Sequence, residues 1–207
     1  FESVTCGPRG VYNYTSGTCD CPLGWTGLFC DVAPADCGFL LAGRYPAGRY
    51  LVEVRLSRLV NVTCEVTSGS CRLLLASNSG RSNHNKTWAE YVAGYAIDGN
   101  NFFLGLDSIH TLTASGSRGL KIDAVFDEAS NTFLTWTYAG VAVSGPLSRY
   151  AITYTSASCQ GSSQSFCSSS LPKCIVPMMV FSTYDVALNL LSVVTGPAVQ
   201  AVAGWWF

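Results

Sequence analysis

The chain has 207 residues, of which 12% are charged, and its formal net charge is −1. This length allows one ordinary domain and a small module with a real hydrophobic core. Because an average globular protein is about 25% charged, the sparse and balanced charges exclude a basic surface, and we expect no nucleic-acid partner.

Cysteines and glycosylation sequons indicate an oxidising, extracellular compartment. The chain has ten cysteines, an even number, and three Asn-x-Thr sequons, which begin at Asn13, Asn61 and Asn85. Such sequons carry N-linked glycans on secreted proteins, and disulfides persist in the same compartment. The opening residues FESVTCGPRG contain an acid and no long apolar segment, so we read them as the start of a mature form or a fragment. The chain is predicted to be a secreted, extracellular glycoprotein.

The segment CGPRGVYNYTSGTCDCPLGWTGLFCD contains closely spaced cysteines and glycines. Cys21 and Cys30 can close a short loop, and Trp25 within that loop can cover the bridge. The tight turns of the loop require Gly24 and Gly27. A structural zinc site would also use close cysteines, but the segment has no histidine and its C-x-C spacing is poor for a zinc knuckle. We therefore favour a disulfide-bonded module.

This segment resembles the C-terminal half of an EGF-like module. That family pairs its cysteines first to third, second to fourth and fifth to sixth. The cysteines that match the second, fourth, fifth and sixth are Cys6, Cys19, Cys21 and Cys30. The resemblance implies the bridges Cys6–Cys19 and Cys21–Cys30, and the two missing cysteines would have paired with each other. We assign residues 1–35 to this truncated module, and we expect no calcium here because the acids of the calcium-binding version are absent.

From residue 36 onward, short alternating segments between glycines and serines predict strands. In GRYLVEVRL, residues 48–56, Val52 and Val54 fall on one face together with Tyr50. The same alternation occurs in GLKIDAVF (119–126) and RYAITYTS (149–156). Only KTWAEYVAGY, residues 86–95, has helical spacing. The predicted fold class is α+β, mostly β.

The order of these motifs is similar to that of the fibrinogen-related C-terminal domain. NFFLGLDSIHTLT, residues 101–113, resembles the family signature W-L-G-L-x-x-I-H-x-L-T, with Phe103 in place of tryptophan. FSTYD, residues 181–185, resembles the opening of the family's calcium loop. The resemblance places His110 in a structural strand as a hydrogen-bonded framework residue. His84 is predicted to be a surface loop residue, and because no nucleophile stands beside either histidine we expect no enzyme.

The resemblance extends from Cys37 to Phe207, so we assign residues 36–207 to a fibrinogen C-terminal-like domain. It implies a bridge between Cys37 and Cys64, a central twisted antiparallel sheet, and a loop-rich C-terminal subdomain that carries binding. The family continues beyond its paired tryptophans, so the domain is expected to be incomplete at its C-terminus.

Further cysteines depart from the family pattern, namely Cys71, Cys159, Cys167 and Cys174. They are enough for two additional bridges whose connectivity stays open, although Cys167 and Cys174 are close enough in sequence to pair easily. We therefore expect all ten cysteines in disulfides. The serine-rich segment SASCQGSSQSFCSSS, residues 156–170, is predicted to be an extended loop pinned by cysteines.

The family's calcium loop is degenerate in this sequence. It begins Asp-x-Asp, whereas Ala187 follows Asp185 at the second carboxylate position. Calcium requires several oxygen ligands, so Asp185 and Asn189 alone predict no calcium and no other cofactor. The candidate ligand or interface residues near this end are Tyr184, Trp205, Trp206 and Phe207. Ligand contact and core packing both remain open for these aromatic residues.

Residues 186–207 carry no charge and reach the length of a membrane span. Gly196 and Pro197 interrupt this run and no basic residue follows it, so we predict that it does not cross a membrane. Two hypotheses on function follow. The first, implied by the resemblance, is a non-enzymatic, lectin-like glycoprotein that recognises extracellular glycan or protein ligands in recognition or cell adhesion. The second is a self-assembling structural subunit of an extracellular fibre, coat or matrix, and we expect a homo-oligomer.

Overall fold

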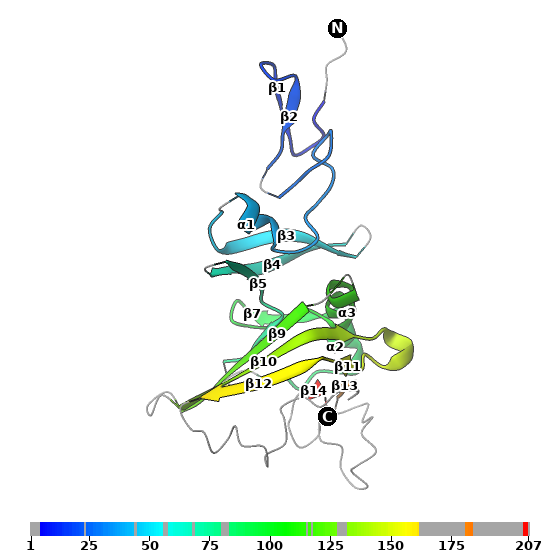
Figure 1. Ribbon diagram of the computed structural model, residues 1–207. Helices are drawn as coiled ribbons and strands as arrows, with labels where there is room; N and C mark the ends of the chain where they lie inside the picture. Colours follow the sequence, from blue (N-terminus) through cyan, green and yellow to red (C-terminus); the bar gives the residue numbers. More distant parts are fainter. Residues whose placement is uncertain are drawn as a thin grey trace. The chain divides into compact units, whose positions relative to one another are not determined.

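The computed structural model describes residues 5–22, 24–43, 45–55, 58–67, 69–79, 83–114, 116, 118–127, 132–161, 181–183 and 205–206. The chain forms two compact units, Phe1–Leu75 and Ala76–Phe207 (Figure 1). The first unit contains the predicted EGF-like module together with the start of the predicted fibrinogen-like region. The predicted boundary between residues 35 and 36 lies within this unit and stays a prediction.

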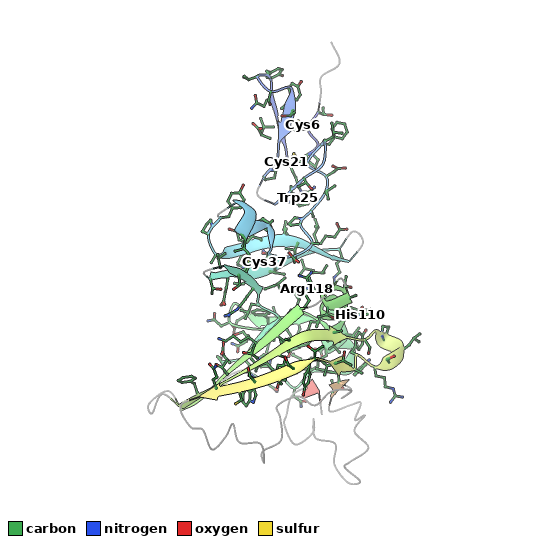
Figure 2. All side chains as sticks on the ribbon, viewed as in Figure 1. Cys6, Cys21, Trp25, Cys37, His110 and Arg118 are labelled. Atoms are coloured by element: carbon green, nitrogen blue, oxygen red, sulfur yellow. A yellow bond between two sulfur atoms is a disulfide. The ribbon has the colours of Figure 1, made fainter. Side chains whose placement is uncertain are left out.

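The first unit opens with a disulfide-bonded hairpin, whose antiparallel strands are β1 (Val11–Asn13) and β2 (Thr18–Asp20). One disulfide joins Cys6 to Cys19 on β2, and a second joins Cys21 to Cys30 (Figure 2). Cys30 is completely buried, although so short a segment cannot build a large hydrophobic core. The bridges that the EGF-like resemblance implied are present in the structure and hold this segment together.

The loop closed by the second disulfide depends on glycine and on one aromatic ring. Gly24 and Gly27 have φ angles of 81° and 91°, in the left-handed region that glycine adopts without steric cost. The guanidinium of Arg9 lies 4.3 Å from the centre of the Trp25 ring, which is a cation–π contact. This contact ties the first disulfide loop to the second.

A three-stranded antiparallel sheet follows in the order β3–β4–β5, and helix α1 contacts β5. The elements are α1 (Phe39–Gly43), β3 (Gly48–Arg55), β4 (Arg58–Thr67) and β5 (Ser70–Leu73). Val52 and Val54 on β3 are completely buried, whereas Leu51 is 43% exposed. This alternation confirms the predicted strand and its buried face. A disulfide joins Cys37, before α1, to Cys64 on β4.

The second unit begins with a small sheet in the order β6–β8–β7, together with helices α2 and α3. The elements are β6 (Ala76–Ser77), α2 (Trp88–Ala93), β7 (Tyr95–Asp98), β8 (Asn101–Phe103) and α3 (Leu106–Ala114). Helix α2 confirms the helix predicted within residues 86–95, and it begins at Thr87 because Thr87 and Glu90 form a capping box. It ends at Gly94, whose φ is 87° and where a Cβ would clash with the Leu104 carbonyl oxygen. Only glycine fits this position.

Helix α3 contradicts the strand expected around His110. Leu106, Ile109 and Thr113 are buried, and their spacing is that of a helix face rather than of a strand. His110 nevertheless is a hydrogen-bonded framework residue, because its Nδ1 lies 2.7 Å from the carbonyl oxygen of Val143. The family motif was therefore matched correctly, while the backbone conformation inferred for it was wrong.

The main sheet is built around β10, which pairs antiparallel with β9, β11 and β12. Its elements are β9 (Arg118–Asp127), β10 (Thr132–Val143), the 3₁₀ turn η1 (Pro146–Ser148), β11 (Ile152–Thr153) and β12 (Ser156–Gly161). Trp136 on β10 lies opposite Ile122 of β9 and Cys159 of β12. The strand that the segment 119–126 predicted is present as β9.

Two predictions in this sheet were partly wrong. The strand predicted over residues 149–156 is reduced to β11, because Arg149 and Tyr150 turn the chain with φ angles of 53° and 52°. The loop predicted over residues 156–170 begins instead as β12, which pairs with residues 134–139 of β10. A long central strand offers hydrogen bonds to a serine-rich neighbour, and this tertiary pairing overrides the neighbour's low strand propensity.

A short antiparallel ladder joins β13 (Phe181–Ser182) to β14 (Trp205–Trp206). In the part of the chain that the structure describes, no helix is both long enough and apolar enough to cross a membrane. Residues 186–204, most of the uncharged segment, lie outside the described residues.

Candidate functional site

The candidate ligand residues that the structure describes lie on the β13–β14 ladder. Trp206 is opposite Phe181, and Trp205 is opposite Ser182. The other residues predicted for this end lie outside the described residues: Tyr184, Asp185, Asn189 and Phe207. The structure therefore locates the backbone of the tryptophan pair, and the position of this backbone depends on what holds β13.

Phe181 anchors the ladder in an aromatic cluster. Its side chain is completely buried. Its ring centre lies 5.1 Å from that of Tyr91, 5.9 Å from that of Phe103 and 6.3 Å from that of Trp88. Such aromatic pairs add roughly 0.5–1.5 kcal/mol each beyond the burial of their area. Since α2 and β8 supply these rings, the core of the second unit fixes β13 and, through it, β14.

A left-handed turn holds Phe181 from the backbone side. The Phe181 N–H donates to the carbonyl oxygen of Arg149 at 3.4 Å. Arg149 and Tyr150 both have positive φ, which costs on the order of 1–3 kcal/mol for each non-glycine residue. Tyr150 is buried, its ring centre lies 5.9 Å from that of Trp88, and its hydroxyl donates to Asp107. These contacts offset the strain and keep the turn in place.

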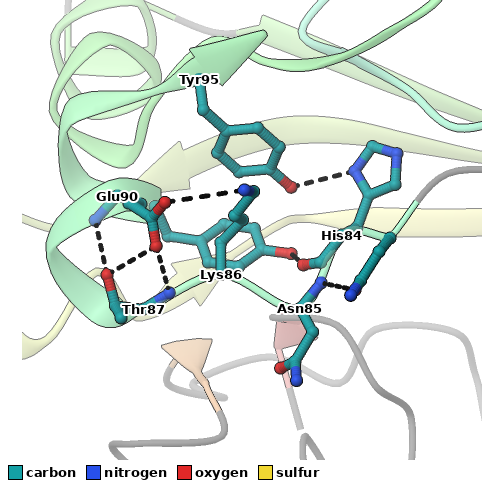
Figure 3. A network of polar contacts seen from close by, with 8 residues as sticks. His84, Asn85, Lys86, Thr87, Glu90 and Tyr95 are labelled. Atoms are coloured by element: carbon teal, nitrogen blue, oxygen red, sulfur yellow. Dashed lines mark hydrogen bonds and ion pairs between the residues drawn. The ribbon is translucent and has the colours of Figure 1, made fainter. Parts of the chain in front are cut away.

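A polar network joins the segment before α2 to β7 (Figure 3). Nδ1 of His84 lies 3.0 Å from the hydroxyl of Tyr95, and the hydroxyl of Tyr91 donates to the His84 carbonyl oxygen at 2.8 Å. His84 is only 6% exposed, so the prediction of a surface loop residue was wrong. Its sequence neighbours Asn83 and Asn85 are polar and gave no signal of burial. The ring is buried because α2 and β7 supply tyrosines that pack around it.

Two groups of the network, Tyr95 and Glu90, have shifted pKa values. Burial, the largest cause, raises the pKa of the Tyr95 hydroxyl far above its usual value, so this hydroxyl stays neutral at physiological pH. The backbone N–H of Thr87 donates to the Glu90 carboxylate at 2.8 Å and lowers the pKa of Glu90. Lys86 lies 3.7 Å from the same carboxylate (Figure 3). These groups hold the start of α2, and no group of three potential metal ligands occurs among the described residues.

Comparison with known proteins decides the family. Residues 33–207 match the family model for the C-terminal globular domain of fibrinogen beta and gamma chains. The chain belongs to this family. Residues 3–33 match the Teneurin-like EGF domain. The fold is similar to the fibrinogen-like globe domain of human ANGPTL6, with a TM-score of 0.67 and 24% identity over 85% of this chain and 75% of that chain. It is equally similar to a lamprey fibrin D-dimer chain, with a TM-score of 0.67 and 22% identity over 85% of this chain and 59% of that chain.

Curated relatives match somewhat less than half of this chain. Ryncolin-4 of Cerberus rynchops is 31% identical over 98 residues, which are 47% of this chain and 28% of that protein. Angiopoietin-related protein 3 of Homo sapiens is 30% identical over 95 residues, which are 45% of this chain and 21% of that protein. Tenascin of Mus musculus is 30% identical over 95 residues, which are 44% of this chain and 4% of that protein. The chain thus spans less than a third of the length of these relatives.

One cysteine of the fibrinogen-like domain departs from the expected pairing. Cys71 is a free, half-buried thiol, contrary to the expectation that all ten cysteines pair. It lies opposite Val66 on β4, and Cys64, two residues before Val66, already bonds Cys37. Burial, the largest cause, raises the pKa of the Cys71 thiol. Cys159 is disulfide-bonded, and the last two cysteines, Cys167 and Cys174, lie outside the described residues.

The three predicted glycosylation asparagines differ in their surroundings. Asn61 on β4 and Asn85 before α2 are exposed. Asn13, in the EGF-like module, is half-buried, and its Oδ1 accepts two backbone N–H groups of the hairpin turn at 2.9 and 3.3 Å. Its Nδ2 donates to Asp20 at 3.0 Å. Occupancy by glycans stays a prediction at all three positions.

Proposed function

We propose that this chain is a secreted, non-enzymatic glycoprotein that acts in extracellular recognition or adhesion by binding a glycan or protein ligand. The observation that carries the proposal is the β13–β14 ladder of a fibrinogen-like domain, with the tryptophan pair of β14 held in register against buried Phe181. Binding residues are often carried by surface segments that a rigid scaffold holds in place, and the buried Phe181 supplies such a scaffold for β14.

Aromatic residues at such a position suit the proposed ligands. Tryptophan and tyrosine present a large apolar face with few rotatable bonds, and they dominate the energetics of many binding sites. The ladder pairs the backbone of Trp205 and Trp206 with β13, so little backbone freedom at these two residues remains to be lost on binding. No metal is required in this scheme, in keeping with Ala187 at the second carboxylate position of the calcium loop.

The absence of catalysis is part of the proposal. In the described part of the chain, the hydrogen bonds of the two histidines go to the Tyr95 hydroxyl and to the Val143 carbonyl. Covalent catalysis needs a nucleophile activated by a neighbouring base or by a lowered pKa, whereas burial raises the pKa of the Tyr95 hydroxyl and a carbonyl oxygen carries no proton to lose. Binding rather than turnover is therefore the expected activity.

The test is a binding measurement on the chain secreted from cultured cells. A glycan array and pull-down from extracellular surfaces should identify a ligand, and Trp205→Ala with Trp206→Ala should weaken its binding by about 2 kcal/mol, roughly thirtyfold in Kd. Tyr14→Ala is the matched control, because Tyr14 is an aromatic residue 91% exposed in the EGF-like module. Absence of any ligand for the folded chain, or equal loss in the control, would contradict the proposal.

A second candidate function is self-assembly into an extracellular fibre, coat or matrix. It is favoured by large apolar side chains on the surface of the EGF-like module, where Val11 is 72%, Leu28 is 83% and Phe29 is 50% exposed. Exposed apolar groups of this kind on a small module often mark interfaces. Sedimentation over a wide concentration range should then show association that Leu28→Asp weakens, whereas a monomer at every concentration would exclude it.

A further inference from the structure

The outer face of the β3–β4 sheet carries two exposed leucines. Leu51 is 43% and Leu59 is 36% exposed, although the opposite face buries Val52 and Val62 almost completely. Leu51 lies opposite Asn61 in the antiparallel register, and Leu59 precedes Asn61 by two residues on the same strand. Side chains two apart on a strand share a face, so both leucines lie on the face that carries Asn61.

Asn61 is the first residue of the sequon Asn61-Val62-Thr63. Its side chain is exposed, and the described residues provide no hydrogen-bond partner for its amide. Asn13, the sequon asparagine of the β1–β2 hairpin, differs from Asn61. Both polar atoms of its side chain make hydrogen bonds within the EGF-like module. The Asn61 amide thus has no partner in the described part of the chain, and it lies beside Leu51 and Leu59 on a face that also carries Glu53, opposite Leu59, and Arg49, opposite Thr63.

We propose that Asn61 is an N-glycosylation site whose glycan packs across Leu51 and Leu59 and forms the outer cover of this sheet. Side chains directly opposite on antiparallel strands have Cβ atoms about 4.5–5.5 Å apart, so the first sugar on Asn61 reaches Leu51. The C–H face of a pyranose ring is apolar and suits leucine, while its hydroxyl groups face water. The glycan removes apolar area from water without a second protein chain.

The modification is an ordinary group transfer and rests on the secretion that the proposed function includes. A lipid pyrophosphate-linked oligosaccharide is the donor. The bond between Nδ2 of Asn61 and C1 of the first sugar forms, the bond between C1 and the pyrophosphate oxygen breaks, Nδ2 loses one proton, and the lipid pyrophosphate leaves. Ligand binding plays no part in this step, so the two proposals can fail independently.

A second copy of the chain is a poorer occupant of the same face. A stable protein interface buries roughly 800 Å² on each partner, far more than two partly exposed leucines offer. The edge of β3 is also occupied, because the Glu53 N–H donates to the Pro34 carbonyl oxygen at 2.8 Å. A second copy therefore cannot extend the sheet by hydrogen bonding at this position.

The first measurement is on glycoprotein secreted from cultured cells. Glycopeptide mass spectrometry should find Asn61 occupied, and Asn61→Gln should lack that glycan. Hydroxyl-radical footprinting should then oxidise Leu51 and Leu59 severalfold faster in Asn61→Gln than in the wild type. Asn85→Gln is the matched control, since it removes a sequon of the second unit and should leave both leucines as protected as before. An unoccupied Asn61, or an occupied Asn61 with unchanged oxidation, would overturn the proposal.

Enzymatic trimming of the glycan on the folded wild type is a second test, and it does not depend on whether a variant folds. Trimming to the first sugar should keep the leucines protected, and complete removal of the glycan should expose them severalfold. If the fully deglycosylated chain stays protected at high concentration and loses protection on dilution, a second copy covers the face and the proposal is wrong. The ligand measurements on Trp205 and Trp206 do not depend on any of these outcomes.

Discussion

The EGF-like module and the second unit keep their structures by different means. In the module, Val11, Tyr14 and Leu28 are between 72% and 91% exposed, and two disulfides supply the restraint. In the second unit, Tyr138 and Phe181 are almost completely buried among other aromatic side chains. The difference follows from size, because a short segment cannot bury enough apolar area to offset the entropy of folding. Covalent restraint replaces the core where the core is too small.

The largest effect on stability is expected when the second unit loses Phe181, the central ring of its aromatic cluster. Phe181→Ala should reduce the free energy of unfolding of this unit by about 3–5 kcal/mol, because the cavity in the aromatic cluster cannot close fully. Hydrogen exchange of the amides in α2 and β8 should report the loss. Leu147→Ala is the control, because Leu147 is fully exposed in η1 and its removal should change stability little. Equal effects of the two variants would contradict the aromatic anchor.

Removing the second disulfide should affect only the EGF-like module. The double variant Cys21→Ala, Cys30→Ala should lose about 2–4 kcal/mol locally, since the restraint on its unfolded state disappears. Amide exchange between residues 19 and 32 should become fast, whereas exchange in β9 and β10 should stay slow. A parallel loss of protection in β10 would mean that the two regions unfold together. It would contradict the view that the module and the second unit are stabilised independently.

A smaller effect is expected at the start of α2. Thr87→Ala removes the side chain that accepts the Glu90 N–H and donates to the Glu90 carboxylate, and it should cost about 1 kcal/mol of stability. Thr87→Ser keeps the hydroxyl and should cost only a few tenths of that. Because Thr87 also completes the Asn85 sequon, both variants are best compared by chemical denaturation of protein made without glycans. Equal losses would show that the cap contributes nothing.

The smallest effect is a dependence on pH. The backbone N–H of Asn100, which donates to Asp98 at 2.7 Å, is the largest cause that lowers the pKa of Asp98. Since the pKa is lower in the folded state, Asp98 stabilises the fold above its unfolded pKa, and this contribution is lost as the pH falls through the folded pKa. Thermal unfolding between about pH 5 and pH 3 should therefore show a shallower decline for Asp98→Asn than for the wild type. Parallel curves would exclude this role.

The parts of the fold that could be predicted are those set by local pattern. The alternation around Val52 predicted β3 and its buried face, and the spacing of residues 86–95 predicted α2. In both segments the periodicity of apolar side chains and the local backbone preference agree. The strand predicted around His110 came from the family resemblance alone, although Leu106, Ile109 and Thr113 recur with the spacing of a helix face.

Other features depend on contacts between distant residues and left no local signal. His84 is buried by tyrosines seven and eleven positions away, while its own neighbours are polar. β12 forms because β10 offers a partner to a serine-rich segment. Cys71 is unpaired, and the other cysteine of its sheet, Cys64, is bonded to Cys37. At the candidate site, sequence motifs indicated the tryptophan pair, but only the three-dimensional cluster identified Phe181 as its anchor.

The position of Phe181 also orders events while the chain is being made. Synthesis proceeds from the N-terminus, so Trp88, Tyr91 and Phe103 leave the ribosome long before Phe181 does. The β9–β10 hairpin pairs neighbouring segments and can form early, whereas the aromatic cluster joins residues far apart in the sequence. Until residue 181 of the 207 has emerged, these rings lack their central partner. The nascent chain therefore exposes an apolar surface that is buried in the finished protein. We expect chaperones to bind this surface before Phe181 has been added to the cluster.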